Sequence, residues 1–327
     1  MPLSPSKRDM LTGILSKANA LLSAKQTQSG TPQRASPTAY FENSSGHQLA
    51  YDMYGQRSGY PLFFFHDAGS SRLEAVFFQN AARKQGFRLI AIDRPGIGCS
   101  EFYHSENSSD FCADVLCLAV QLELSSFGLM SCGAGGVYAT TLAYRHPQAV
   151  KVHLNLAGIP GNVFNESLAQ STTAGLINEW TPALIEFGVR LRHALFTEDT
   201  DSALARMQEF LSYTDRKVLA LPRIRQILAM DQSESIRNGA RGVAQDLAMC
   251  YRKLDFCLQQ VPVPTDIWQG SADHLAWRAN CEYQTSRLPN ARFFRVPNRG
   301  HFFFLTCMDE IFQRLRTRCD IQQDLAA

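Results

Sequence analysis

Residues whose types suit acid–base chemistry follow the ends of four apolar runs in this sequence of 327 residues. His66 and Asp67 follow the first run, Asp93 the second, and Asp273 and His301 the last two. Histidine and carboxylate side chains are the usual groups that exchange protons with a substrate. Because an open α/β sheet binds its ligands beyond the carboxyl ends of its strands, the four stretches are predicted to share one site.

A further stretch, residues 127–139, brings an apolar run to an abrupt stop in a cluster of very small residues. An amphipathic segment follows and ends at residues 146–147, which are His-Pro. A strand, a sharp turn and a helix are the simplest interpretation. The turn holds the hydroxyl of Ser131 and the thiol of Cys132 next to Gly133.

The elements that must position these residues alternate between strand and helix. The first two strands are predicted to form a β-hairpin around a turn at residues 43–46. Strands are predicted at residues 39–42, 48–54, 62–65, 88–92, 127–130, 150–156, 266–268 and 292–296, and helices at residues 72–85, 111–122, 135–145, 276–287 and 308–318. Such alternation predicts an α/β fold with a mostly parallel central sheet of about eight strands, wrapped by helices.

The domain organisation follows from changes in this pattern. Residues 159–257 lose the strand signal and show helical periodicity, which predicts a helical cap inserted into a core of residues 38–158 and 258–327. Residues 1–37 form a basic amphipathic segment and a linker rich in Gln, Ser, Thr and Pro. This extension could contact a membrane surface or a partner, or be a transit peptide, but loose docking on the domain is favoured.

Composition excludes several classes of function. A net charge of +2 does not indicate a surface that binds nucleic acid. No apolar run is long enough to span a bilayer. The nine cysteines are odd in number and contain no Cys-x-x-Cys pair, so a disulfide framework or a zinc site is not expected. We therefore expect reduced thiols, a cytoplasmic location, and neither metal nor cofactor.

The loops after the strands resemble those of the α/β-hydrolase superfamily, in the branch with a His-Gly-x-Pro-Gly-Ser loop and an Asp-Arg-Pro-Gly-x-Gly-x-Ser loop. Residues 66–72, 93–100, 270–273 and 298–301 carry the resemblance, which extends over residues 38–318. It implies that Asp273 is the acid of a catalytic triad and His301 its general base. In that chemistry a buried carboxylate fixes the imidazole tautomer and stabilises the imidazolium that forms.

The resemblance also implies an oxyanion hole made of two backbone N–H groups. One would come from Ala134, after the nucleophile position, and the other from Asp67 or Ala68, in the loop after His66. Asp67 stands where the family usually has glycine. A carboxylate there would repel a developing oxyanion unless it pointed away.

Within the resemblance, the nucleophile position falls on Gly133. The family has small residues two positions before and two positions after its nucleophile, and this register provides them. Centring the turn on Ser131 or Cys132 would instead place Leu129 or Met130 at the first of these positions and crowd the turn. Glycine keeps the strained turn and removes the nucleophilic oxygen.

Several functions therefore remain open. The chain is expected to be related to esterases and lactonases that act on small acyl compounds, with activity impaired by Gly133. Alternatively, it is an active hydrolase that uses Cys132, Ser131 or water activated by His301, or a serine-to-glycine variant of an active serine hydrolase. A non-catalytic ligand-binding or interaction protein is the third class. The expected ligand is a small acyl or apolar molecule, and the sequence does not indicate an oligomeric state.

Overall fold

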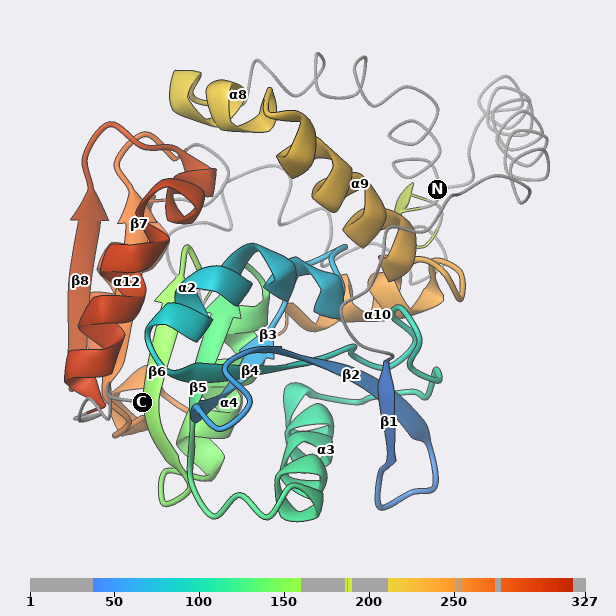
Figure 1. The fold of residues 1–327 in the computed structure, drawn as a ribbon. Coiled ribbons are helices and arrows are strands. Elements are labelled where there is room, and N and C mark those ends of the chain that lie inside the picture. Colours follow the sequence, from blue (N-terminus) through green and yellow to red (C-terminus); the bar gives the residue numbers. More distant parts are fainter. Residues whose placement is uncertain are drawn as a thin grey trace, which may run out of the picture.

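Eight strands form one sheet in the computed structural model, in the order β1-β2-β4-β3-β5-β6-β7-β8 (Figure 1). The structure describes residues 38–159, 186, 188–189, 211–250, 252, 254–273 and 278–319. The strands are β1 (Ala39–Glu42), β2 (Gln48–Gly55), β3 (Tyr60–Phe65), β4 (Phe87–Ile92), β5 (Phe127–Cys132), β6 (Val150–Leu156), β7 (Thr265–Gly270) and β8 (Ala291–Val296). Pairing is antiparallel along β1-β2-β4 and parallel between all other neighbours, which confirms the predicted fold class.

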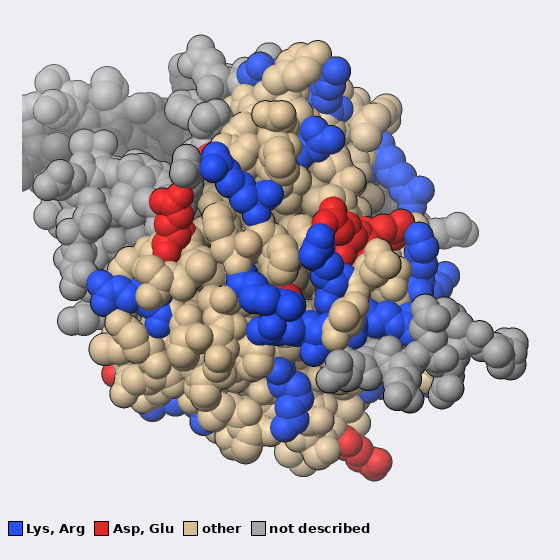
Figure 2. All heavy atoms as spheres, turned by 90° about the vertical axis from the view of Figure 1, so that its left-hand side faces the viewer, with Lys and Arg blue, Asp and Glu red and all other residues tan. Residues whose placement is uncertain are grey.

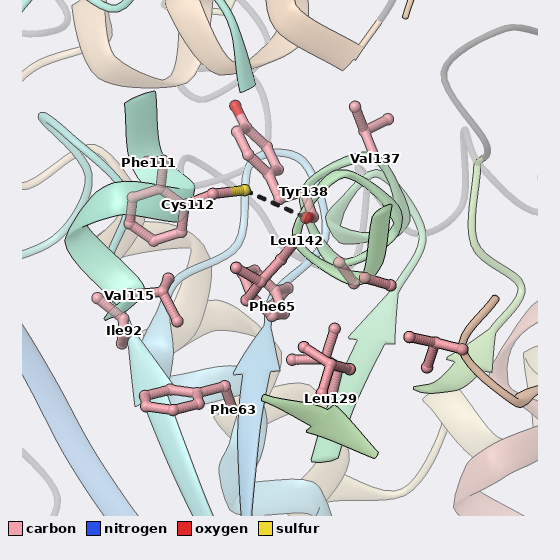
Figure 3. Close-up of a cluster of buried hydrophobic side chains, with 14 of the residues drawn as sticks. Phe63, Phe65, Ile92, Phe111, Cys112, Val115, Leu129, Val137, Tyr138 and Leu142 are labelled. Carbon is pink, nitrogen blue, oxygen red and sulfur yellow. Dashed lines mark hydrogen bonds between the residues drawn. The ribbon is translucent and has the colours of Figure 1, made fainter. Parts of the chain in front are cut away.

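Helices cover both faces of the sheet. On one face lie α3 (Ser108–Gln121), α4 (Gly135–Arg145) and α11 (Arg278–Arg287), and on the other lie η1 (Arg72–Phe78), α2 (Gln79–Lys84) and α12 (Phe304–Arg318). Alternate residues of the central strands enter the two cores, which is why β3 reads as a continuous apolar run. Figure 3 shows the first core, where Phe63 and Phe65 of β3 lie beneath Phe111 of α3 and Leu142 of α4.

The segment predicted as one helix at residues 72–85 is instead a 3-10 helix, η1, followed by the short α-helix α2. Ser71 caps η1 by accepting a hydrogen bond from the Leu73 N–H, and the Glu74 N–H donates to the Ser71 carbonyl. This three-residue spacing is that of a 3-10 turn.

The helical cap predicted at residues 159–257 lies partly outside the described residues, as does the whole N-terminal extension at residues 1–37. The described part of that region contains α8 (Tyr213–Leu219), α9 (Pro222–Ser235) and α10 (Arg241–Cys250). A short 3-10 turn, η3 (Leu258–Gln260), leads back to β7, and another, η4 (His301–Phe303), precedes α12. In the ranges that the structure describes, no helix is long and apolar enough to cross a membrane.

Basic side chains gather over the β8 and α12 side of the molecule (Figure 2). Arg292 and Arg295 lie exposed on β8, the last strand in the sheet order, and Arg314 is exposed on α12. Arg292 pairs with Asp266 and Arg314 with Glu310, so part of this charge is neutralised locally. Charged residues on an edge strand discourage pairing with a further strand.

Candidate active site

Gly133 forms the sharp turn between β5 and α4 with a φ of +46°, in the left-handed region that glycine adopts without strain. Its N–H donates to the Leu156 carbonyl over 3.2 Å, and its own carbonyl accepts from the Ile159 N–H over 2.8 Å. The start of α4 also passes very close to β3, since a Cβ on Gly135 would lie 2.3 Å from the Phe65 carbonyl oxygen. This close approach brings the turn against the loop that follows β3.

The Asp67 carboxylate points into this turn. Its Oδ1 accepts a hydrogen bond from the Ala134 N–H over 2.7 Å and another from the Ala68 N–H over 2.7 Å. A Cβ added to Gly133 would lie 2.0 Å from the same oxygen. Asp67 therefore occupies the space in front of Gly133 and engages both N–H groups that the sequence predicts as the oxyanion hole. The Asp67 carboxylate therefore does not point away from the predicted oxyanion hole.

The backbone of Asp67 is held from two directions. Its N–H donates to Oε2 of Glu74 over 2.8 Å. Arg94 donates to the carbonyl oxygens of His66 over 2.8 Å and of Asp67 over 3.2 Å. Arg94 in turn is paired with Asp246 of α10, at 2.7 Å, so α10 helps to fix the loop. Sequence reasoning missed Glu74 and Asp246, and it quoted Arg94 only as part of a family motif.

Two further carboxyl groups, those of Glu74 and Asp231, lie near this loop in surroundings that raise their pKa values. Burial, together with the nearby charges of Asp231 and Asp67, raises the pKa of Glu74 well above its usual value. Burial also raises the pKa of Asp231 to about 7, although Ser70 and Ser71 donate hydrogen bonds to it. A carboxyl group in a low-dielectric interior favours its neutral form. Glu74 can therefore accept from the Asp67 backbone without adding a second full charge.

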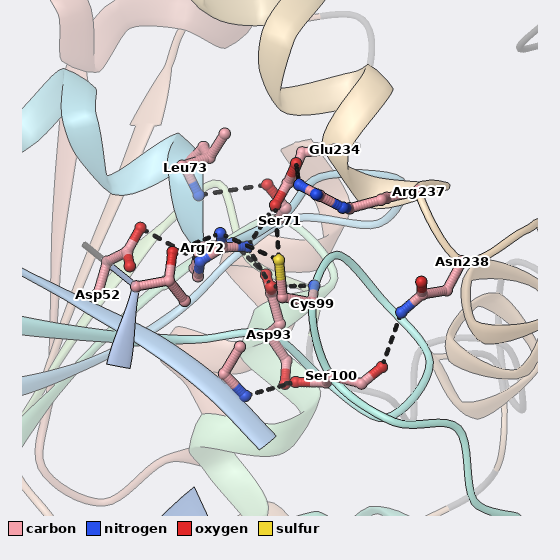
Figure 4. A network of polar contacts seen from close by, with 12 residues as sticks. Asp52, Ser71, Arg72, Leu73, Asp93, Cys99, Ser100, Glu234, Arg237 and Asn238 are labelled. Atoms are coloured by element: carbon pink, nitrogen blue, oxygen red, sulfur yellow. Dashed lines mark hydrogen bonds and ion pairs between the residues drawn. The ribbon is translucent and has the colours of Figure 1, made fainter. Parts of the chain in front are cut away.

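A buried cation joins the sheet and its loops to α9 on the adjacent side (Figure 4). The Arg72 guanidinium pairs with Asp52 at 3.2 Å, with Glu234 of α9 at 2.8 Å, and with Asp93. Its side chain is fully buried, and the Arg72 backbone N–H donates to Asp93 over 2.7 Å. The first residue of η1 is thus fixed to the end of β4, which orients the loop that carries Asp67.

Asp273 and His301 meet at the carboxyl ends of β7 and β8. His301 Nδ1 lies 3.0 Å from Oδ2 of Asp273. The His301 backbone N–H donates to Oδ2 of Asp215 in α8 over 3.0 Å, a contact with a residue that the sequence did not single out. Burial by itself lowers the pKa of His301, but the charge and hydrogen bond of Asp273, aided by Asp67 and Asp215, raise it to about 9. His301 is therefore an imidazolium at neutral pH.

We expect His301 to make folding stability depend on pH. Its pKa of about 9 exceeds the ordinary value of 6.5, so the folded state holds the proton more tightly than the unfolded state. This contribution is fully present below pH 6.5 and is lost as the pH rises through 9, a loss of about 3 kcal/mol for such a shift. Guanidinium unfolding of wild type and His301→Gln between pH 6 and 10 measures it. The difference between the two proteins should shrink with pH, and a constant difference would contradict the expectation.

The two alternative nucleophiles lie inside the sheet layers. Ser131 is fully buried, and its Oγ lies 2.8 Å from His153 Nε2 on the adjacent strand β6. Cys132 is 3% exposed and packs in the core on the α2 and α12 side. Burial, with the charges of Glu74, Asp67 and Asp231, raises the pKa of the Cys132 thiol well above its usual value. A protonated thiol is a poor nucleophile.

Three solved structures with the same fold have names that state an enzymatic activity. An esterase from Exiguobacterium antarcticum is 19% identical over 87% of this chain and 100% of its own, with a TM-score of 0.67. An enol-lactonase from Burkholderia xenovorans LB400 is 17% identical over 86% of this chain and 100% of its own, with a TM-score of 0.64. A bromoperoxidase from Bacillus anthracis is 17% identical over 87% of this chain and 100% of its own, with a TM-score of 0.65. At these identities the likeness concerns the fold.

Comparison with curated proteins finds no match. The family model described as alpha/beta hydrolase fold matches residues 59–306, which is more than half of the chain. The match runs from the start of β3 to the first residues of α12 and includes Asp67, Gly133, Asp273 and His301. The chain therefore belongs to the α/β-hydrolase fold family.

Proposed function

We propose that this α/β-hydrolase-fold protein takes a small acyl or apolar ligand and is impaired as an ester hydrolase of the serine type. One observation carries the proposal: Oδ1 of Asp67 accepts hydrogen bonds from the N–H groups of both Ala134 and Ala68. In the serine mechanism those donors bind the oxyanion of the substrate. An ester carbonyl would have to displace a bound carboxylate before it could react.

Gly133 also has no side chain that could act as the nucleophile, and this alone prevents ester hydrolysis by the serine mechanism. The surroundings of the two neighbouring candidates support this proposal, because Ser131 is paired with His153 and Cys132 is buried with a raised pKa. Names of structural neighbours with esterase and lactonase activity support small acyl compounds as the ancestral substrate class. The Asp273–His301 pair is the part of the machinery that this proposal regards as retained.

The test measures the rate of ester hydrolysis and the residues that covalent reagents label. We expect hydrolysis of p-nitrophenyl acetate and butyrate no faster than that of the His301→Ala variant, and no fluorophosphonate adduct at Ser131. Native protein treated with iodoacetamide should be labelled at Cys257, which is exposed, and not at Cys132. Ester turnover at rates typical of esterases that disappears in His301→Ala would contradict the proposal.

A further inference from the structure

The loop that carries His301 is held from outside the sheet by the carboxylate of Asp215, in α8. We propose that Asp215 is a positioning residue, which fixes the backbone of His301 and thereby the orientation of its imidazole toward Asp273. The inference rests on the proposed function, because it concerns the Asp273–His301 pair that this function regards as retained. It gives α8 a direct role at the site.

Both oxygens of the Asp215 carboxylate accept hydrogen bonds from the backbone around His301. Oδ2 accepts from the His301 N–H over 3.0 Å, and Oδ1 accepts from the Phe302 N–H over 2.9 Å. The Gly300 N–H donates to Oγ1 of Thr214 over 3.1 Å. Three consecutive N–H groups of the loop are therefore bound by two consecutive side chains of α8. Two of these bonds end on a carboxylate, and such bonds are roughly twice as strong as those between neutral groups.

Asp215 acts here as a helix cap that comes from a different helix. The N–H groups at the start of a helical segment have no partner within it and are usually capped by the side chain of the preceding residue. The residue that precedes η4 is Gly300, which has no side chain to provide a cap. A Cβ at position 300 would lie 1.8 Å from Oδ2 of Asp215. Glycine at this position therefore both leaves the cap to Asp215 and lets its carboxylate approach.

Asp215 can fix this loop because it is itself held in place. The Oγ of Ser212 accepts from the Asp215 N–H over 3.1 Å and donates to Oδ2 over 2.9 Å, within the capping box of α8. The helix α8 contacts α9, in which Asp231 accepts from the Ser71 N–H over 2.9 Å. The support of the His301 loop is thus anchored on the opposite side of the site, next to the loop after β3.

Two carboxylates therefore act on different parts of His301. Asp273 meets Nδ1 at 3.0 Å, whereas Asp215 holds the backbone N–H. The rotamers open to a side chain depend on its backbone, so a fixed backbone favours the rotamer that reaches Asp273. Burial lowers the pKa of His301, whereas nearby carboxylates, that of Asp215 among them, raise it. Loss of Asp215 should therefore weaken the contact with Asp273 and lower this pKa.

An NMR titration of the full chain tests the inference. The imidazole signals of His301 are identified by their absence in His301→Gln, and they are followed as the pH rises through 9. In Asp215→Asn we expect the pKa of His301 to be lower than in wild type by about 1, the smaller end of the effect of a nearby opposite charge. The downfield signal of the Nδ1 proton should weaken as well.

The matched control is Asp110→Asn, which makes the same change at the same position of another capping box, that of α3. It should leave the pKa of His301 and its Nδ1 signal as in wild type. If both were also unchanged in Asp215→Asn, the inference would be wrong, even if that variant were less stable, because Asp215 would then be only a structural cap.

Gly300→Ala separates the position of Asp215 from its charge. The variant keeps the carboxylate, but the new Cβ takes the place of Oδ2 and forces the carboxylate away from the loop. We expect a weaker Nδ1 signal here too, and faster hydrogen exchange of the His301 and Phe302 amides. A full Nδ1 signal would mean that Asp215 acts by its charge alone, against the inference. Ester hydrolysis tests the proposed function separately, because an active esterase would overturn that function while the titration still decided the role of Asp215.

Discussion

Gly133→Ser alone is expected to leave the protein without ester hydrolysis, whereas Asp67→Gly combined with Gly133→Ser should raise it by at least ~10³-fold over wild type, given the measured effects of nucleophiles and oxyanion donors. The reason is steric. A Cβ at position 133 would meet Oδ1 of Asp67 at 2.0 Å, closer than any real contact. Removing the carboxylate makes room for the serine and frees the N–H groups of Ala134 and Ala68.

The assay is p-nitrophenyl butyrate hydrolysis, with kcat/KM measured for the two single variants and the double variant. Asp67→Gly with Gly133→Ala is the matched control, because it has the same room and backbone strain but no hydroxyl. Adding His301→Ala to the active double variant should abolish the gain. If Gly133→Ser by itself equalled the double variant, Asp67 would not block the turn. If the double variant stayed inactive, the retained Asp273–His301 pair would not support acyl transfer.

The second large effect is expected on stability. Arg72→Met should lower the free energy of unfolding at pH 7.5 by about 3–5 kcal/mol, the usual cost of removing one partner from a buried ion pair. Arg72 is fully buried between Asp52, Asp93 and Glu234, so the variant removes the cation beside Asp52 and Asp93, whereas Glu234 keeps its pair with Arg237. The loss should also loosen α9, which Glu234 ties to the core.

The pH dependence of Arg72→Met separates charge from packing. Burial raises the pKa of Asp93 to about 6 even though Arg72 opposes the shift. Without Arg72, the folded state should bind protons on these carboxyls more tightly than the unfolded state, so the deficit should shrink as the pH falls from 7.5 to 5. Arg145→Met, which breaks the exposed pair with Asp255, should cost less than about 1 kcal/mol. Urea unfolding measures all of these, and a deficit unchanged at pH 5 would point to lost packing.

The core elements could be predicted from sequence because their local and long-range signals agree. Residues 135–145 and 150–156 carry a clear helical and a clear apolar pattern, and α4 and β6 have these bounds. The placement of Asp273 and His301 after two successive parallel strands also sufficed to predict that they meet. Parallel strands bring their carboxyl ends to one edge of the sheet.

The orientation of Asp67 could not be predicted, because a sequence pattern gives a residue's position on a loop and not its rotamer. That orientation depends on the missing side chain at Gly133 and on the contacts of the Asp67 backbone with Glu74, in η1, and with Arg94, in the loop after β4. The individual bounds of α8 and α9, inside the helical segment predicted at residues 159–257, were not predicted for a related reason. These helices contact the rest of the protein partly through the hydrogen bond of Asp215 with His301 and the ion pair of Glu234 with Arg72. Such polar contacts leave no periodic pattern of apolar residues in the sequence.

The steric conflict between Asp67 and a side chain at position 133 also couples the residues that these two positions can hold. Of the four combinations of serine or glycine at 133 with glycine or aspartate at 67, only serine with aspartate places a Cβ against the Asp67 carboxylate and requires that carboxylate to leave its present position. The effect of a serine at position 133 is therefore expected to depend on which residue stands at position 67.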